Sequence, residues 1–224
     1  ASMRFAALTS GGKDSILAIC RALEEGHDVL AMITAVPENT ESYMFHSANL
    51  NAVPVMAERA GMQYIPIQTK GVKEEELTDL KNGIAAAKQE LHLDGITTGA
   101  IASAYQRSRI SSICEELDLV LYAPLWGCSP DAIIDEVIEK LDARIIVTAA
   151  DGLNENVLGK RIDTALKPVL KAVEAKRRIN IAGEGGEYES LVLNAPFFSS
   201  PITAEGMQMV KTGMTGSVTY TRFS

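Results

Sequence analysis

The residues best placed for chemistry form a six-residue loop near the start of the chain: Ser10, Gly11, Gly12, Lys13, Asp14 and Ser15. Its two glycines have no Cβ, so the backbone can approach a ligand closely. The loop precedes a predicted helix, whose free N–H groups and positive dipole end favour a bound anion. Lys13 adds a positive charge, and the two serines add hydroxyl donors. This combination predicts a binding site for phosphate oxygens.

The loop differs from two common nucleotide-binding motifs. A Walker A loop requires the spacing G-x-x-x-x-G-K-[ST], but Ala7 stands where its first glycine belongs and Asp14 follows Lys13. The loop does not match G-x-G-x-x-G either. Asp14 suits a magnesium ion or an N–H donor. The alternative is a plain glycine turn capped by Ser10. This alternative is less favoured, because all six residues at the strand–helix junction suit a phosphate site.

Hydrophobic patterns before residue 125 alternate between strand-like and helix-like segments. Short apolar runs predict strands at residues 4–9, 29–36, 64–67, 95–99 and 119–122. Periodic apolar residues predict helices at residues 13–25, 51–60, 74–91 and 103–117. This alternation predicts an α/β fold with a doubly wound parallel sheet. In such sheets ligands bind at the carboxyl ends of the strands.

The pattern changes after Trp126. Residues 131–141 predict a helix, residues 143–148 a strand, residues 166–173 a helical stretch, and the tail from residue 179 short strands and loops. We therefore expect a smaller C-terminal α+β domain, with the boundary between residues 125 and 126. No low-complexity linker marks this boundary, so we expect the two parts to pack tightly, with Trp126 at their junction.

Composition narrows the class of protein. The 224 residues suffice for one domain with a smaller companion, and aromatics are only 5%, so the core must be mostly aliphatic. A formal charge of −8 repels phosphate backbones, so stable nucleic-acid binding is not expected. The three cysteines form no C-x-x-C pair, which favours a reducing cytoplasm. No apolar run approaches the roughly 20 residues of a membrane span, so no membrane association is expected.

The loop sequence Ser-Gly-Gly-Lys-Asp-Ser resembles the pyrophosphatase (PP) loop of the ATP pyrophosphatase superfamily. Further stretches, in the same order along the chain, resemble the diphthine–ammonia ligase family. They are residues 43–46 with Asn49, residues 99–101, Ser103, residues 105–107 with Arg109, residues 124–126, 152–153, 158–159 and 183–196. Two departures are Ser190, where the family usually has threonine, and the turn at residues 127–130, where a more polar sequence is expected.

This resemblance implies a fold, a reaction and a division of labour. The fold is HUP-like (adenine nucleotide alpha hydrolase-like), with an ATP-binding PP-loop domain at residues 3–125 and a substrate-binding domain at residues 126–224. The reaction is ATP-dependent amidation of diphthine, a modified histidine of translation elongation factor 2, with ammonium. A carboxylate is a poor electrophile, so AMP is first transferred to it. The resulting acyl-adenylate then reacts with ammonia, and AMP and pyrophosphate are released. ATP and Mg²⁺ are the implied cofactors.

The same resemblance suggests roles for individual residues. ATP-binding positions are the loop together with Gly99 and Ala100. Catalytic candidates are Lys13, Asp14 and Glu187, and Asp14 is also the candidate Mg²⁺ ligand. Substrate-binding candidates are His46, Tyr105, Gln106, Arg107, Glu184, Glu187, Tyr188 and Glu189. Diphthine carries a trimethylammonium group, and carboxylates with an aromatic ring suit such a cation. The glutamates alternatively bind the incoming ammonium, and one or two of them are equally well explained as solvated loop residues.

Three other functions remain open. A tRNA-modifying member of the superfamily is disfavoured by the acidic charge and by the lack of paired cysteines. A self-contained amidotransferase would lack a glutaminase portion, so free ammonia would be its nitrogen source. A non-catalytic ATP sensor has no need of the second, acidic and glycine-rich region. A homodimer is possible, although no sequence pattern indicates one.

Overall fold

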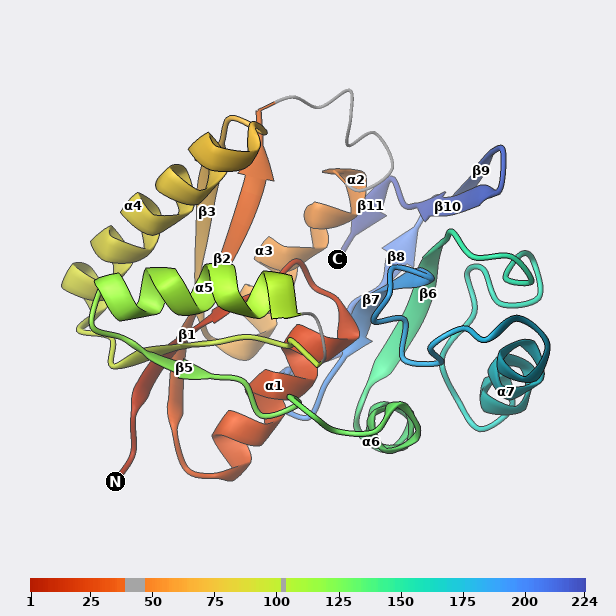
Figure 1. Cartoon of the computed structure of the whole chain (residues 1–224), viewed down its shortest axis with the longest axis horizontal. Coiled ribbons are helices and arrows are strands. Elements are labelled where there is room, and N and C mark those ends of the chain that lie inside the picture. The colour runs from red at the N-terminus through yellow and green to blue at the C-terminus, as the bar shows by residue number, and fades with distance from the viewer. Residues whose placement is uncertain (39–46, 102–103) are drawn as a thin grey trace.

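A five-stranded parallel sheet with helices on both faces forms the N-terminal part of the computed structural model, which describes residues 1–38, 47–101 and 104–224 (Figure 1). The strand order is β3-β2-β1-β4-β5. The strands are β1 (Arg4–Leu8), β2 (Asp28–Pro37), β3 (Gln63–Thr69), β4 (Gly95–Thr97) and β5 (Val120–Tyr122). The helices are α1 (Lys13–Glu24), α2 (Ser47–Leu50), α3 (Ala52–Ala60), α4 (Lys73–Leu91) and α5 (Ala104–Glu116). The predicted doubly wound α/β fold is thus confirmed.

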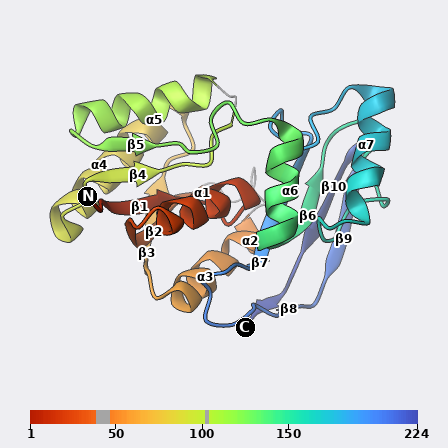
Figure 2. The same ribbon diagram turned by 90° about the horizontal axis from the view of Figure 1, so that it is seen from below.

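Each face of this sheet has its own apolar layer. Phe5, Ala7 and Met32 point toward α1 and α3, whereas Ala6 and Ile33 point toward α4 and α5. Neighbouring residues of one strand face opposite sides, so a strand buried on both faces is apolar throughout. Figure 2 shows α5 and α3 on opposite sides of the sheet.

The order of the strands reverses between β1 and β4. The chain moves outward from β1 through β2 to β3, then returns to the other side of β1 for β4 and β5. Loops that leave two adjacent parallel strands in opposite directions open a crevice at the carboxyl edge of the sheet. The loop of residues 10–15 follows β1, and Gly99 follows β4, so both lie at this crevice.

The C-terminal part is built on an antiparallel sheet of order β7-β6-β10-β9, accompanied by the two-stranded sheet β11-β8. Its elements are α6 (Pro130–Lys140), β6 (Asp142–Thr148), α7 (Leu166–Arg177), β7 (Tyr188–Asn194), β8 (Ala204–Glu205), β9 (Gln208–Thr212), β10 (Thr215–Thr219) and β11 (Arg222–Phe223). The predicted boundary between residues 125 and 126 falls between the last strand of the first sheet and α6.

Helix α1 joins the two parts. One continuous core runs from the α1 face of the first sheet into α6, β6 and β7, and α6 lies beside α1 (Figure 2). Arg21 of α1 donates two hydrogen bonds to Glu136 of α6, at 3.1 Å from Nε and 2.6 Å from Nη2. Lys140 also approaches Glu24, at 2.8 Å. The parts therefore share both apolar and ionic contacts.

Two local differences from the sequence predictions have simple causes. The strand predicted at residues 64–67 extends over residues 63–69 as β3, and Pro66 is tolerated inside it because β3 is an edge strand. The one-turn helix α2 was not predicted because four residues are too short to show a helical period. Within the described ranges, no helix is both long and apolar enough to cross a membrane.

Candidate functional site

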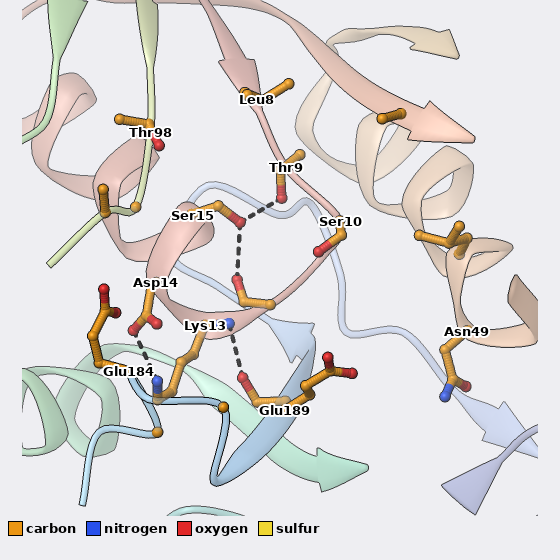
Figure 3. A pocket seen from close by; sticks show the side chains of 18 of the residues that line it. Leu8, Thr9, Ser10, Lys13, Asp14, Ser15, Asn49, Thr98, Glu184 and Glu189 are labelled. Atoms are coloured by element: carbon orange, nitrogen blue, oxygen red, sulfur yellow. Dashed lines mark hydrogen bonds and ion pairs between the residues drawn. The ribbon is translucent and has the colours of Figure 1, made fainter. Parts of the chain in front are cut away.

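A cavity of about 650 Å³ lies at the carboxyl ends of β1 and β4 and is walled by both parts of the chain (Figure 3). Ser10, Gly12, Lys13, Asp14 and Ser15 form one wall, with Gly99 and Ala100 beside them. A second wall, adjoining the first, comes from the C-terminal part and consists of Ile146, Gly183, Glu184, Gly186, Tyr188, Glu189 and Ser190. The structure therefore brings together most of the predicted ATP-binding residues and several of the predicted substrate-binding residues.

Backbone geometry explains the two glycines of the loop. Gly11 has φ +88°, in the left-handed region that favours glycine, and an added Cβ would lie 2.9 Å from Cε of Met56. Gly12 is the N-cap of α1 and has no side chain with which to cap it. The first N–H groups of α1 are thus left for other partners, as an anion-binding helix end requires.

Hydroxyl groups brace the loop from inside. Thr9 accepts a hydrogen bond from the amide of Gly11 at 2.9 Å, and its Oγ1 lies 2.6 Å from Oγ of Ser15. Ser15 also hydrogen-bonds the carbonyl of Gly12 at 3.2 Å. Sequence reasoning missed Thr9, although a hydroxyl directly before the motif was a usable signal. Ser10 is exposed at the cavity.

Lys13 is buried, with only 3% of its side chain exposed. Its Nζ donates to the carbonyl of Ala182 at 2.5 Å and to Oδ1 of Asp14 at 2.9 Å, and lies 5.3 Å from the centre of the Tyr188 ring. Burial opposes the ammonium charge, but Asp14 and the other neighbouring groups outweigh it and raise the pKa of Lys13 above its ordinary value of 10.5. The amine therefore remains an ammonium at neutral pH.

Strand β7 holds the loop in place from the other part of the chain. The amide of Lys13 donates to Oγ of Ser190 at 3.0 Å, and the amide of Val192 donates to the carbonyl of Gly11 at 2.9 Å. The hydroxyl of Ser190 thus partners an N–H group that the N-cap glycine leaves unpaired. Residue 190 is 177 positions from residue 13, and no local pattern could have indicated this contact.

Gly99 lets β4 come very close to the start of α1. A Cβ at this position would lie 2.4 Å from both the carbonyl carbon of Asp14 and the amide nitrogen of Ser15. These are backbone atoms, which cannot swing aside as a side chain can. The neighbouring Ala100 lines the cavity and is buried. Both residues occupy the predicted position, and their contact with ATP stays a prediction.

The three predicted glutamates do not share one environment. Glu184 and Glu189 line the cavity, and Figure 3 shows Glu184 beside Asp14 and Lys13. Glu187 does not belong to the lining. Its Oε2 instead accepts a hydrogen bond from the amide of Asn180 at 2.6 Å, which closes the loop before β7. A catalytic role for Glu187 remains a prediction, but its observed contact is structural.

Tyr188, a predicted substrate-binding residue, is buried beside Lys13. Its ring lines the cavity but is 97% buried, and the nearby cation is Lys13. Its hydroxyl donates to the carbonyl of Ile181 at 2.6 Å, and burial raises the pKa of Tyr188 to about 12. The ring therefore lies against Lys13, and a contact between Tyr188 and a substrate cation stays a prediction.

Several predicted residues lie away from the cavity or outside the described structure. The guanidinium carbon of Arg107 lies 4.3 Å from the centre of the Trp126 ring, a cation–π contact at the junction of the two parts. Arg109 lines a separate hollow between α4 and α5. His46 lies outside the described residues. The side chains of Tyr105 and Gln106 are also outside what the structure describes.

Asn49, suggested by the family resemblance, reaches the cavity from the one-turn helix α2. It is 97% buried, its Nδ2 donates to the carbonyl of Val218 at 2.8 Å, and it lines the cavity. Among the described residues, its Oδ1 has no hydrogen-bond partner. Figure 3 shows Asn49 across the cavity from Lys13 and Asp14.

Asp14 is the predicted magnesium ligand, which would share the ion with phosphate oxygens of a bound nucleotide. In the described part of the chain, no group of three or more His, Cys, Asp or Glu side chains is arranged to hold a metal. Mg²⁺ commonly takes only one or two carboxylates and fills its other positions with phosphate oxygens and water. The carboxylate of Asp14, which lies beside the predicted phosphate site, fits this pattern.

Comparisons with known proteins cover nearly the whole chain. The model of the diphthamide synthase N-terminal domain matches residues 3–121, and that of the diphthamide synthase C-terminal domain matches residues 129–223. A diphthine–ammonia ligase from Danio rerio is 32% identical, over 93% of this chain and 89% of its own length. One from Homo sapiens is 32% identical, over 93% of this chain and 85% of its own length. A solved structure from Methanocaldococcus jannaschii, described as a predicted subunit of tRNA methyltransferase, is 14% identical, over 87% of this chain and 98% of that one, with a TM-score of 0.47.

Proposed function

Because the chain belongs to the diphthamide synthase family, we propose that it amidates the diphthine residue of elongation factor 2 with ammonium, at the cost of ATP cleavage to AMP and pyrophosphate. The observation that carries this proposal is one cavity with two unlike walls. One wall carries the PP-loop at the start of α1, and the other carries Glu184 and Glu189. Phosphates suit the first wall, and a cationic acceptor suits the second.

The PP-loop wall is proposed to bind the phosphates of ATP. Gly12 leaves the first amides of α1 without a local cap, and the helix dipole favours negative charge at that end. Lys13 remains an ammonium, because Asp14 and its other neighbours hold its pKa high despite burial. Because Gly99 has no Cβ, the loop after β4 packs directly against the backbone of Asp14 and Ser15 at this helix end. The residues 3–125 are accordingly proposed as the ATP-binding domain.

Asp14 is proposed to hold Mg²⁺ together with phosphate oxygens. When bound, the ion would offset the negative charge of the phosphates and of the departing pyrophosphate. Asp14 itself is fixed by Lys13, 2.9 Å away. The pair orients both side chains at the start of α1 before a nucleotide arrives, which avoids the entropic loss of ordering them during binding.

The chemistry proceeds in two substitutions. A carboxylate oxygen of diphthine attacks the α-phosphorus of ATP, and the bond to the pyrophosphate oxygen breaks. The acyl-adenylate has a good leaving group, so the nitrogen of ammonia attacks its carbonyl carbon and the bond to the AMP oxygen breaks. The attacking nitrogen loses a proton to give the neutral amide. The protein's contribution is to position the two reactants and to stabilise the negative charge that develops on phosphate.

The acceptor is proposed to enter along the wall that contains Glu184 and Glu189. Glu184 and Glu189 line the cavity and offer negative charge to the trimethylammonium group or to ammonium. Tyr188 is proposed to act indirectly, by supporting Lys13. The residues 126–224 are accordingly proposed as the substrate-binding domain.

The decisive experiment supplies the protein with ATP, Mg²⁺, ammonium and elongation factor 2 that carries diphthine. We expect AMP to form only when all four are present, with the mass decrease that replacement of OH by NH₂ produces on the acceptor. Formation of ADP would overturn the adenylation step. AMP formation that depends on tRNA would favour a tRNA-modifying enzyme, and ATP binding without turnover would favour a sensor. The Lys13→Met variant serves as the matched inactive control.

A further inference from the structure

Ser190 lies where β7 passes the PP-loop. The residue pairs with Ile145 in the β6–β7 ladder, lines the cavity, and accepts a hydrogen bond from the amide of Lys13 at 3.0 Å. Its backbone carbonyl and Oγ lie 3.5 and 3.9 Å from the position that a Cβ of Gly12 would occupy. The hydroxyl therefore stands next to the start of α1 although it belongs to the other part of the chain.

A serine hydroxyl has one proton to donate and two lone pairs that accept. The lone pair facing α1 is used by the amide of Lys13. Among the described residues, Ser190 makes no other hydrogen bond through its side chain. The proton of its hydroxyl group therefore remains available for a ligand in the cavity that Ser190 lines. An N–H donor behind the oxygen also polarises the hydroxyl and strengthens it as a donor.

We propose that Ser190 is a phosphate-binding residue, which donates its hydroxyl proton to the pyrophosphate portion of ATP. The inference rests on the proposed function, because it takes the PP-loop as the phosphate site. The Lys13 amide donates to the hydroxyl oxygen of Ser190, and the hydroxyl in turn donates to the phosphate. A residue from the C-terminal part thus completes the anion site. Serine and threonine both satisfy this requirement, whereas alanine does not.

The choice of phosphates follows from position. Ser190 contacts the first turn of α1, where the amides and Lys13 favour the most negative part of the nucleotide. That part is the β- and γ-phosphates, which leave together as pyrophosphate. A contact that strengthens as pyrophosphate gains charge also favours the adenylation step.

Binding measurements on three ligands test the proposal. Dissociation constants for ATP, inorganic pyrophosphate and AMP are measured by calorimetry with the wild-type protein and with Ser190→Ala and Ser190→Thr. We expect Ser190→Ala to weaken ATP and pyrophosphate by about tenfold or more, the usual effect of losing a hydrogen bond to a charged group. AMP binding should change little, and Ser190→Thr should retain most of the affinity for all three ligands.

The matched control is Ser217→Ala, which removes a buried hydroxyl from β10 in the same sheet but outside the cavity lining. It should leave all three dissociation constants unchanged. Equal weakening of AMP and ATP by Ser190→Ala would show that the hydroxyl only shapes the loop, and unchanged ATP affinity would show no phosphate contact. Either result overturns the inference. Failure of the wild-type protein to bind ATP would instead refute the proposed function itself.

Discussion

Gly99 and Asp14 approach so closely that a Cβ on Gly99 would lie 2.4 Å from the carbonyl carbon of Asp14. The contact joins the loop after β4 to helix α1, which begins at the PP-loop. It lies at the carboxyl ends of β1 and β4, the two strands between which the strand order reverses. Any side chain at residue 99 would have to push these two backbone segments apart.

We predict that Gly99→Ala weakens ATP binding strongly and lowers the free energy of unfolding by about 2 kcal/mol or more, as expected for overpacking against atoms that cannot yield. Calorimetry with ATP and a urea titration measure the two effects. Gly26→Ala is the control, because Gly26 has φ +88° and open space around its Cβ position. It should show a strain cost in stability without loss of ATP affinity. Wild-type affinity in Gly99→Ala would contradict the close packing.

Replacement of Lys13 tests the charge at the helix end. Lys13→Met keeps an unbranched apolar stem but removes the ammonium, and we expect the rate of AMP formation to fall on the order of a hundredfold. The raised pKa of Lys13 adds a pH prediction: its charge is present below pH 10.5 and is lost only as pH rises through the higher folded value. The rate of AMP formation should therefore show no loss attributable to Lys13 between about pH 7 and 9. Near-wild-type turnover by Lys13→Met would remove this lysine from the mechanism.

The ion pair between α1 and α6 should make stability depend on pH. Hydrogen bonds from Arg21 lower the pKa of Glu136 below its ordinary value of 4.5, despite the opposing effect of burial. The stabilisation is therefore present above pH 4.5 and disappears as pH falls through the lower folded value. At pH 7 we expect Glu136→Gln to cost about 1–2 kcal/mol in the free energy of unfolding.

Urea titrations of the wild type and Glu136→Gln at a series of pH values check this prediction. The two stabilities should converge as the solution is acidified below pH 4.5. Glu139→Gln, on an exposed position of the same helix, is the matched control and should follow the wild type throughout. A pH-independent difference between Glu136→Gln and the wild type would point to packing instead of the ion pair.

The glutamates of the second part should separate into two classes. Glu184→Gln and Glu189→Gln are expected to reduce kcat/KM for the diphthine acceptor, because both residues line the cavity. Glu187→Ala is expected to lower Tm, because it removes the acceptor for the Asn180 amide. Thermal melts and acceptor kinetics on the same preparations distinguish the classes. Loss of activity in Glu187→Ala with an unchanged Tm would support the predicted catalytic role of Glu187.

Much of the N-terminal part could be predicted from the sequence. The strand–loop–helix unit of residues 4–24 is encoded by neighbours along the chain: an apolar strand, two glycines and a helical apolar stripe. The same local signals indicated β2, α4 and α6 to within a residue or two. Strand β3 was predicted too short, and the arrangement of β7, β6, β10 and β9 was not predicted at all, because sheet pairing depends on partners far away in the chain.

What the sequence by itself determined about this protein is the glycine-rich loop of residues 10–15 between a strand and a helix, its parallel α/β core and its family. Only the tertiary structure decided which residues of the second part face that loop. Glu184 and Glu189 line the cavity while Glu187 turns to Asn180, and Ser190 reaches Lys13. The physical reason differs for the two segments. Glu184 and Glu187 lie in a glycine-rich loop without a fixed period, so the direction of each side chain depends on what the loop folds against. Glu189 and Ser190 lie in β7, whose place beside the loop of residues 10–15 depends on its pairing with β6.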